Sequence, residues 1–246
     1  MEKPVRFYSE NQRILGNLHL PHTRAPCVVT LHGLESGKDN GKWPTVAAGL
    51  YHAGYACLRF NFRGCGEGEQ KSDGEFEDLT LTARIKDYKA ALDHLETMDE
   101  VDTNLLGVVG SSFGGMVAVA AQDLRVKAVV TLGSPYKIPR FDEPRIPKLQ
   151  GDYYILPSGR RFKKSFYEDL RGYDLLKAVE HSPPILVIHG SADETVPVEH
   201  AQKLYEHASH PKSLEIIEGA DHVFSGQEHL DKAIELSLEW FNEYLQ

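Results

Sequence analysis

The stretch that decides the fold is Gly110-Ser111-Ser112-Phe113-Gly114. It follows a short apolar run at Leu105–Val109 and opens a segment with helical spacing at Gly114–Asp123. A serine with glycine two positions before and two positions after it is typical of a sharp turn between a strand and a helix, because that turn leaves no room for a Cβ at either position. The spacing predicts that the hydroxyl of Ser112 projects above a sheet at the N-terminus of a helix, where developing negative charge is favoured.

The neighbouring serine does not satisfy the same spacing. Ser111 is flanked by Val109 and Phe113, and both carry a Cβ where the turn needs glycine. The pentapeptide by itself would also suit a loop rich in glycine and serine that only starts a helix. The apolar run before it favours the nucleophile turn, and Ser112 is therefore the candidate nucleophile.

On both sides of this turn, short apolar runs alternate with segments of helical periodicity. The first two expected strands suit an antiparallel start, and the later ones are apolar on successive residues, as in strands covered on both faces. The expected strands are Val5–Tyr8, Ile14–Leu20, Cys27–Leu31, Ala56–Phe62, Leu105–Val109, Ala128–Leu132, Ile185–Ile188 and Leu214–Ile217. The expected helices are Thr45–Ala53, Leu81–Thr97, Gly114–Asp123, Val198–Ala208 and Gln227–Tyr244. This alternation predicts an α/β fold with a mainly parallel sheet wrapped on both sides.

Length and charge limit the class of protein. The chain has 246 residues, and its 27 basic and 36 acidic residues give a net charge of −9. Nucleic acids and anionic membranes need clustered positive charge, so neither is an expected partner. The longest apolar runs are strand length, well short of the roughly 20 residues that span a bilayer. One domain over residues 1–246 is expected, with a hydrophobic core large enough to fold without disulfides or a structural metal.

The cysteines indicate the compartment. Cys27, Cys57 and Cys65 form neither an even set nor a C-x-x-C pair, which argues against a disulfide framework and a zinc knuckle. The start of the chain is polar and lacks the apolar stretch of a secretory signal, so a cytoplasmic location is expected. Dinucleotide and P-loop fingerprints are incomplete and metal-ligand spacings are missing, so no metal and no cofactor are expected.

One stretch interrupts the alternation of strands and helices. Residues 137–177 contain aromatic residues, a basic cluster at Arg160–Lys164, and the prolines Pro139, Pro144, Pro147 and Pro157. An insertion of this length between two core strands favours a cap over a site. Within it, Tyr153–Leu156 and Arg160–Tyr167 are expected to form a hairpin with Gly159 in its turn.

Two roles are open for the apolar side chains of this insertion. They line an acyl or alcohol pocket, or they anchor the cap to the domain. The basic cluster is either a solvated hairpin edge or a site for an anionic leaving group. The candidate substrate-binding residues are Tyr153, Tyr154, Ile155, Leu156, Phe162 and Phe166.

A serine nucleophile needs a general base and a carboxylate that orients the base. In the architecture that carries this turn, the acid and then the histidine follow the serine along the chain. Asp193 and His222 each follow an apolar run, at the strand ends where open α/β sheets build their sites. They are the candidate acid and base. The rivals for the acid are the adjacent Glu194 and, more weakly, Asp221, because neighbouring residues such as Asp221 and His222 rarely point their side chains at each other.

Acyl transfer also needs hydrogen-bond donors for an oxyanion. The backbone N–H of Phe113, the residue after the nucleophile, is one candidate. The other is the backbone N–H of Leu34, in the loop His32-Gly33-Leu34-Glu35 after the expected strand Cys27–Leu31. A plain strand-ending turn at His32-Gly33 is the alternative interpretation.

Together these motifs resemble those of the α/β-hydrolase superfamily. The insertion before Ile185 is similar to that of small serine esterases of the cinnamoyl/feruloyl esterase and monoacylglycerol-lipase-like groups. The resemblance implies a twisted, mostly parallel sheet of about eight strands, a triad of Ser112, His222 and Asp193, and an oxyanion hole at Leu34 and Phe113. It covers nearly the whole chain, and the segments that carry it, in order, are His32-Gly33, Phe62–Gly68, Gly110–Gly115, His189–Pro197 and Gly219–His222.

The expected activity is hydrolysis of a small-molecule carboxylic ester through an acyl-enzyme intermediate. A thioesterase or acyltransferase that acts on acyl thioesters with an anionic carrier is the first alternative, and the basic cluster at Arg160–Lys164 would support it. A binding module that has lost catalysis is the second. Such proteins usually lack one triad member, whereas all three are present in this sequence.

Overall fold

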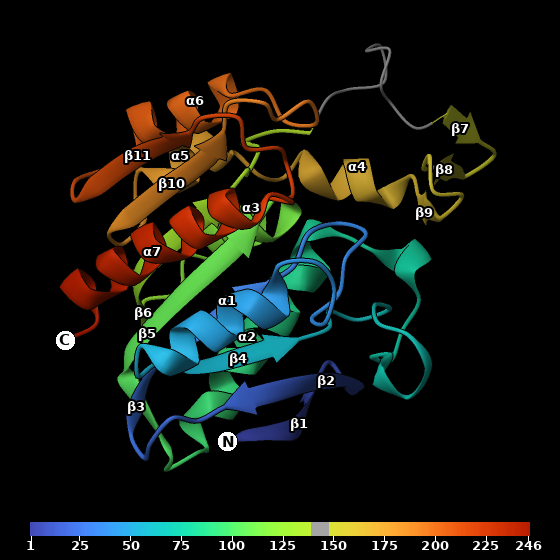
Figure 1. The fold of residues 1–246 in the computed structure, drawn as a ribbon. Helices are drawn as coiled ribbons and strands as arrows, with labels where there is room; N and C mark the ends of the chain where they lie inside the picture. The colour runs from blue at the N-terminus through green and yellow to red at the C-terminus, as the bar shows by residue number, and fades with distance from the viewer. Residues whose placement is uncertain (139–147) are drawn as a thin grey trace.

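The structure is a computed structural model that describes residues 1–138 and 148–246. Its centre is an eight-stranded sheet with the order β1-β2-β4-β3-β5-β6-β10-β11 (Figure 1). β1 and β4 are antiparallel to β2, and the other neighbouring strands are parallel. The predicted sheet is confirmed, including its antiparallel start. The strands are β1 (Glu2–Ser9), β2 (Gln12–His19), β3 (Ala25–Leu31), β4 (Ala56–Phe60), β5 (Val101–Ser111), β6 (Val126–Leu132), β10 (Ile185–Gly190) and β11 (Lys212–Ile217).

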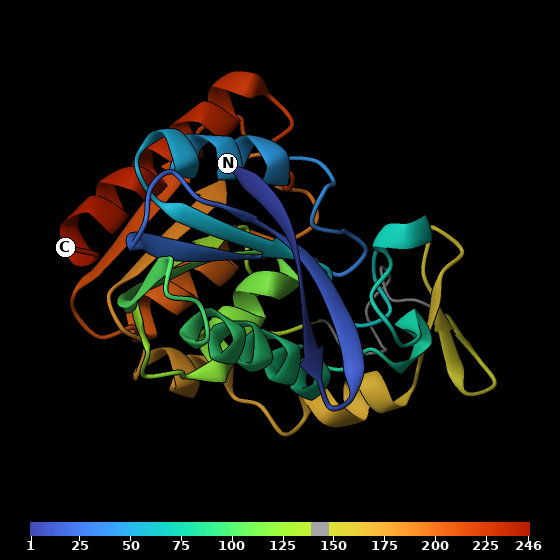
Figure 2. The same ribbon diagram turned by 90° about the horizontal axis from the view of Figure 1, so that it is seen from below.

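Helices cover both faces of the sheet (Figure 2). The core accordingly has two clusters, and adjacent strand residues belong to opposite ones: Val108 of β5 packs in one cluster and Val109 in the other. This is why the strands are apolar on successive residues. One face carries α1 (Trp43–His52) and α7 (Gln227–Tyr244), and the other carries α2 (Leu81–Glu96), α3 (Phe113–Ala121), α5 (Leu175–Val179) and α6 (Glu199–His207).

The longest helix, α7, packs through one apolar stripe. Leu230, Ala233 and Phe241 are buried along it, and Leu245 is buried just after its last residue. Among residues 1–138 and 148–246, no helix combines the length and the apolarity needed to cross a membrane.

A second sheet, β7-β8-β9, lies outside the main sheet (Figure 1). Its antiparallel β8–β9 hairpin has Gly159 in the turn with a φ of +85°, as the sequence predicts. The segments are β7 (Lys148–Gln150), β8 (Tyr153–Ile155), β9 (Arg161–Lys163) and the helix α4 (Ser165–Leu170), and the single-turn 3-10 helices η1 (Gly68–Gln70) and η2 (Phe76–Asp78) lie between β4 and α2.

The predicted second strand of the hairpin, Arg160–Tyr167, is too long. β9 ends at Lys163 and α4 follows. Phe166 and Tyr167 are both buried, and a strand with one covered face cannot bury two consecutive side chains. Three prolines of the predicted insertion lie outside the described residues: Pro139, Pro144 and Pro147.

Candidate active site

Ser112 lies alone between the end of β5 and the start of α3. Its φ of +54° is in the left-handed region that a residue with a side chain rarely adopts. The flanking glycines have a steric reason. A Cβ at Gly110 would lie 2.5 Å from the carbonyl oxygen of Gly114, and a Cβ at Gly114 would lie 2.0 Å from that of Leu31. The turn therefore presents the Ser112 side chain at the N-terminus of α3.

The structure brings three predicted side chains together at one edge of the sheet. His222 Nε2 lies 3.1 Å from Ser112 Oγ, and His222 Nδ1 lies 2.7 Å from Asp193 Oδ2. Asp193 follows β10 and His222 follows β11, so both come from loops at the carboxyl ends of parallel strands. With Nδ1–H donating to the carboxylate, Nε2 is free to accept a proton from the serine hydroxyl.

Asp193 is tightly bound in its loop. Its side chain is 1% exposed, and Oδ1 accepts hydrogen bonds from the backbone N–H groups of Thr195 at 2.9 Å and Val196 at 2.8 Å. The buried His189 adds a contact, with Nε2 3.3 Å from Asp193 Oδ2. Burial by itself raises the pKa of Asp193, but its hydrogen bonds outweigh burial and lower that pKa well below the ordinary value.

The rival Asp221 faces another group. It accepts a hydrogen bond from the backbone N–H of Ser225 at 2.9 Å and another from the Ser225 hydroxyl. These bonds stabilise the turn after His222 and lower the pKa of Asp221. The carboxylate that contacts the His222 ring is that of Asp193.

The loop after β3 is oriented by a buried arginine that the sequence analysis did not single out. Arg84 of α2 donates to the carbonyl oxygens of His32 at 3.3 Å, Gly33 at 3.0 Å and Leu34 at 2.9 Å. The Gly33 carbonyl and the Leu34 N–H belong to one trans peptide unit and point in opposite directions. Because Arg84 binds the carbonyl, the Leu34 N–H points away from Arg84.

Leu34 and Phe113 lie together in the wall of a cavity that also contains Ser112. Neither backbone N–H donates to another group of the described chain. For Phe113 the reason is its place as the first residue of α3, where backbone N–H groups have no intrahelical acceptor. Both donors are available to a negatively charged oxygen.

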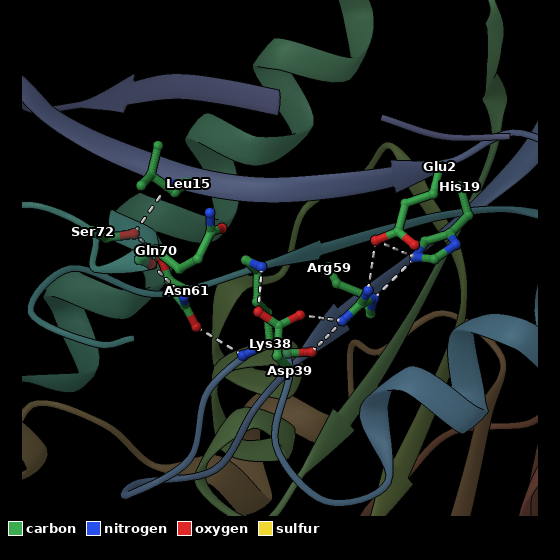
Figure 3. A network of polar contacts seen from close by, with 9 residues as sticks. All are labelled: Glu2, Leu15, His19, Lys38, Asp39, Arg59, Asn61, Gln70 and Ser72. Atoms are coloured by element: carbon green, nitrogen blue, oxygen red, sulfur yellow. Dashed lines mark hydrogen bonds and ion pairs between the residues drawn. The ribbon is translucent and has the colours of Figure 1, made fainter. Parts of the chain in front are cut away.

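A second network fixes the rest of the same loop (Figure 3). Arg59 of β4 donates to the carbonyl oxygen of Lys38 at 2.7 Å and to Asp39 Oδ1 at 2.6 Å, and it also pairs with Glu2 at 3.0 Å. Asn61 Oδ1 accepts from the backbone N–H of Lys38 at 2.8 Å. Buried polar side chains in β4, just after β4 and in α2 thus bind the loop along its length.

The cavity beside Ser112 has a volume of about 450 Å³. This is within the size range of small-molecule sites. His222 lies in its wall with a side chain that is 17% exposed. Among the described residues, the rest of the wall comes from 33–36, 42–43, 111–113, 195–197 and 223, together with Pro135, Lys137, Ile138 and His200.

Comparison with known proteins identifies the family. A model of the prolyl oligopeptidase family matches residues 45–246. The chain belongs to this family. It is a hydrolase with the α/β-hydrolase fold, as the sequence motifs predict.

Relatives of this hydrolase extend over different shares of the chain. The putative esterase YitV of Bacillus subtilis (strain 168) is 26% identical over 96% of this chain and 98% of its own length. The quorum-quenching protein AidA of Acinetobacter baumannii (strain MDR-ZJ06) is 32% identical over 131 residues, which are 52% of this chain and 42% of AidA. The solved structure of Est1E from Butyrivibrio proteoclasticus with bound ferulic acid superposes with a TM-score of 0.87, at 24% identity over 98% of each chain.

The six predicted substrate-binding residues do not line the cavity of this hydrolase. Phe162 and Phe166 are each 1% exposed, with ring centroids 4.5 Å apart, and Phe166 lies 5.5 Å from Phe113. Their rings pack on one another and on the core because burying aromatic surface is more favourable than exposing it in an open cavity. This packing favours the anchoring interpretation for Tyr154, Leu156, Phe162 and Phe166, which are buried in the core, whereas Tyr153 and Ile155 are half-buried and lie outside both the core and the cavity wall.

The basic cluster at Arg160–Lys164 is largely paired. Arg161 lies 2.6 Å from Glu77, Lys163 pairs with Asp78, and Lys164 lies 2.8 Å from Asp152. The Arg160 guanidinium lies 3.5 Å from the centroid of the Phe76 ring. The contacts of Arg160, Arg161 and Lys163 join the β8–β9 hairpin to the η2 segment, and together with the Lys164–Asp152 pair they leave little free charge for an anionic carrier.

Two residues of the site had only weak sequence signals. Arg84 lies at helical spacing from Leu81, Ile85 and Tyr88, which are all buried. An arginine on the apolar face of a helix indicates a buried side chain that needs polar partners. His189 lies four residues before Asp193, but one sequence cannot show which of many histidines is buried. Only the folded chain shows which groups these two side chains contact.

Proposed function

We propose that the chain is a serine carboxylesterase with Ser112 as nucleophile, His222 as general base and Asp193 as the orienting acid. The observation that carries the proposal is the continuous hydrogen-bonded series from Ser112 Oγ through the His222 ring to Asp193, beside a cavity of about 450 Å³. The name of YitV, a putative esterase, supports an ester as the substrate.

The proposed reaction has two halves. His222 Nε2 takes the proton of the Ser112 hydroxyl as Oγ attacks the carbonyl carbon, and then gives that proton to the leaving alcohol. Water attacks the acyl-enzyme by the reverse route and releases the acid. Asp193 holds the imidazole in the required tautomer and stabilises the imidazolium. This series needs no metal or cofactor.

The backbone N–H groups of Leu34 and Phe113 are the proposed oxyanion donors. Removing one such donor typically lowers the rate by about 10²–10³-fold. The proposal is supported by the three carbonyls that Arg84 binds, because these contacts turn the Leu34 N–H away from α2. Arg84 is thus a positioning residue for the donor.

Replacing Arg84 by methionine is expected to lower kcat for an ester by about 10²-fold, with a smaller change in KM, because the Leu34 N–H loses its orientation. Arg84→Lys keeps the charge and is expected to fall between the wild type and Arg84→Met. Arg59→Met is the matched control, since it removes another buried arginine that binds the same loop and is expected to lower the melting temperature more than kcat. An Arg84→Met enzyme that is folded and keeps its kcat would exclude this role.

We also propose that residues 137–177 cap this site within a single domain spanning 1–246. The hydroxyl of Ser158, at the hairpin tip, donates to Glu35 in the oxyanion loop. Asp169 of α4 accepts from the backbone N–H of Thr82 at 3.0 Å.

The cysteines Cys27, Cys57 and Cys65 are free and buried, which supports a cytoplasmic, reducing location.

Peptide bonds are the second substrate class, because the family is named for oligopeptidases. A fluorophosphonate probe and a substrate panel test both classes. We expect labelling at Ser112, turnover of para-nitrophenyl butyrate, and little turnover of aminoacyl para-nitroanilides. The reverse preference would assign a peptidase, and the absence of labelling in folded protein would refute a serine hydrolase.

A further inference from the structure

A lysine lies in the wall of the same cavity as Ser112. Lys42, the residue before α1, donates one hydrogen bond from Nζ to Ser111 Oγ at 2.9 Å. Its ammonium group also lies over the rings of Trp43 at 5.8 Å and Phe224 at 5.5 Å. Within the described parts of the chain, no carboxylate lies within 4.0 Å of it. An ammonium has three N–H donors, so two remain available for a group in the cavity.

The surroundings of Lys42 leave its charge poorly solvated. Burial lowers the pKa of Lys42 to about 8, although Asp221 and Asp193 act in the opposite direction. The group is therefore still mainly protonated at neutral pH. A partly buried ammonium with one hydrogen bond gains most from an anionic acceptor, because aromatic faces only partly replace water.

The rest of the cavity wall is compatible with an anion. Its lining contains a second lysine, Lys137, and one carboxylate, Glu35, among the described residues. The Ser158 hydroxyl donates to Glu35. Among the described residues of the wall itself, the two lysines Lys42 and Lys137 thus outnumber the one carboxylate, Glu35.

We propose that this hydrolase acts on esters that carry a second, ionised carboxylate, and that Lys42 binds that carboxylate. The inference rests on the proposed esterase function. Lys42 and Ser112 line the same cavity, so one substrate there can place a carboxylate at Lys42 and its ester carbonyl at Ser112. Such a charge-assisted contact sets specificity because a neutral group cannot replace it.

The test compares acidic esters with neutral counterparts of the same shape. For a carboxylate on the acyl side, the pair is glutarate monoethyl ester and its amide, ethyl glutaramate. For a carboxylate on the alcohol side, the pair is para-acetoxybenzoate and para-acetoxybenzamide. The measured quantity is the ratio of kcat/KM for the acidic ester to that for the neutral one. We expect about tenfold or more for at least one pair in the wild type, the size of one charge-assisted hydrogen bond.

Three variants assign the effect. Lys42→Met is expected to bring the ratio close to one, and Lys42→Arg to keep most of it. Lys137→Met is the matched control in the same cavity and is expected to keep the wild-type ratio. Melting temperatures of all variants show whether each is folded.

The other outcomes overturn the proposal in distinguishable ways. If Lys42→Met slows both esters equally and keeps the ratio, Lys42 only supports the turn through Ser111. If Lys137→Met removes the preference and Lys42→Met does not, the carboxylate binds elsewhere. A wild type that hydrolyses both members of each pair equally, through Ser112, refutes the inference and keeps the proposed esterase. A wild type that hydrolyses para-nitrophenyl butyrate but none of the four esters also refutes the inference alone, and one that hydrolyses none of the five refutes both.

Discussion

Replacing Ser112 by alanine is expected to lower kcat/KM for para-nitrophenyl butyrate by about 10⁴-fold or more, because the attacking oxygen is removed. The residual rate would come from the oxyanion donors and from substrate binding. KM should change little, since the hydroxyl makes no contact that substrate binding alone requires. Steady-state kinetics at high enzyme concentration and labelling by a fluorophosphonate probe check this result.

The matched control for this experiment is Ser111→Ala, which removes a hydroxyl one residue away from the same turn. It is expected to retain most of the activity toward this neutral ester. Both variants should fold, since neither adds volume beside Gly110 or Gly114, where a Cβ has no room. A rate near that of the wild type in Ser112→Ala would refute the assignment of the nucleophile.

Replacing Asp193 by asparagine is expected to lower kcat by about 10⁴-fold, the typical cost of the wrong histidine tautomer. The two backbone N–H groups of Thr195 and Val196 bind Oδ1 and require an oxygen there. The amide NH2 of asparagine would therefore face His222 and donate to Nδ1. The His222 proton would then lie on Nε2, which could no longer accept the proton of Ser112.

Asp221→Asn is the comparison for this variant. Asp221 bonds to Ser225 and not to the His222 ring, so its replacement is expected to reduce activity only slightly and to lower the melting temperature. Steady-state kinetics and thermal unfolding of both variants check the ranking. A larger loss of kcat in Asp221→Asn than in Asp193→Asn would move the acid role to the neighbouring residue.

Much of the fold was predictable because the sequence patterns are local. The apolar runs match all eight strands of the main sheet within a few residues, and Gln227–Tyr244 is a helix with the predicted bounds. The hairpin was less predictable: the aromatic pattern of Arg160–Tyr167 also fits a helix once Phe166 and Tyr167 are both buried. A pattern of apolar residues does not say which neighbours will cover them.

The amino-acid sequence by itself determined the α/β order of elements and the turn at Ser112, because strand patterns and glycine spacing act over a few residues. It also placed Asp193 and His222 after strands that end at one edge of the sheet. Only the tertiary structure decided that Arg84 binds the loop around Leu34, that the aromatic residues of the insertion pack away from the cavity, and that Lys42 lies beside Ser111. Those contacts join segments far apart in the chain, and their partners are set by how helices pack on the sheet.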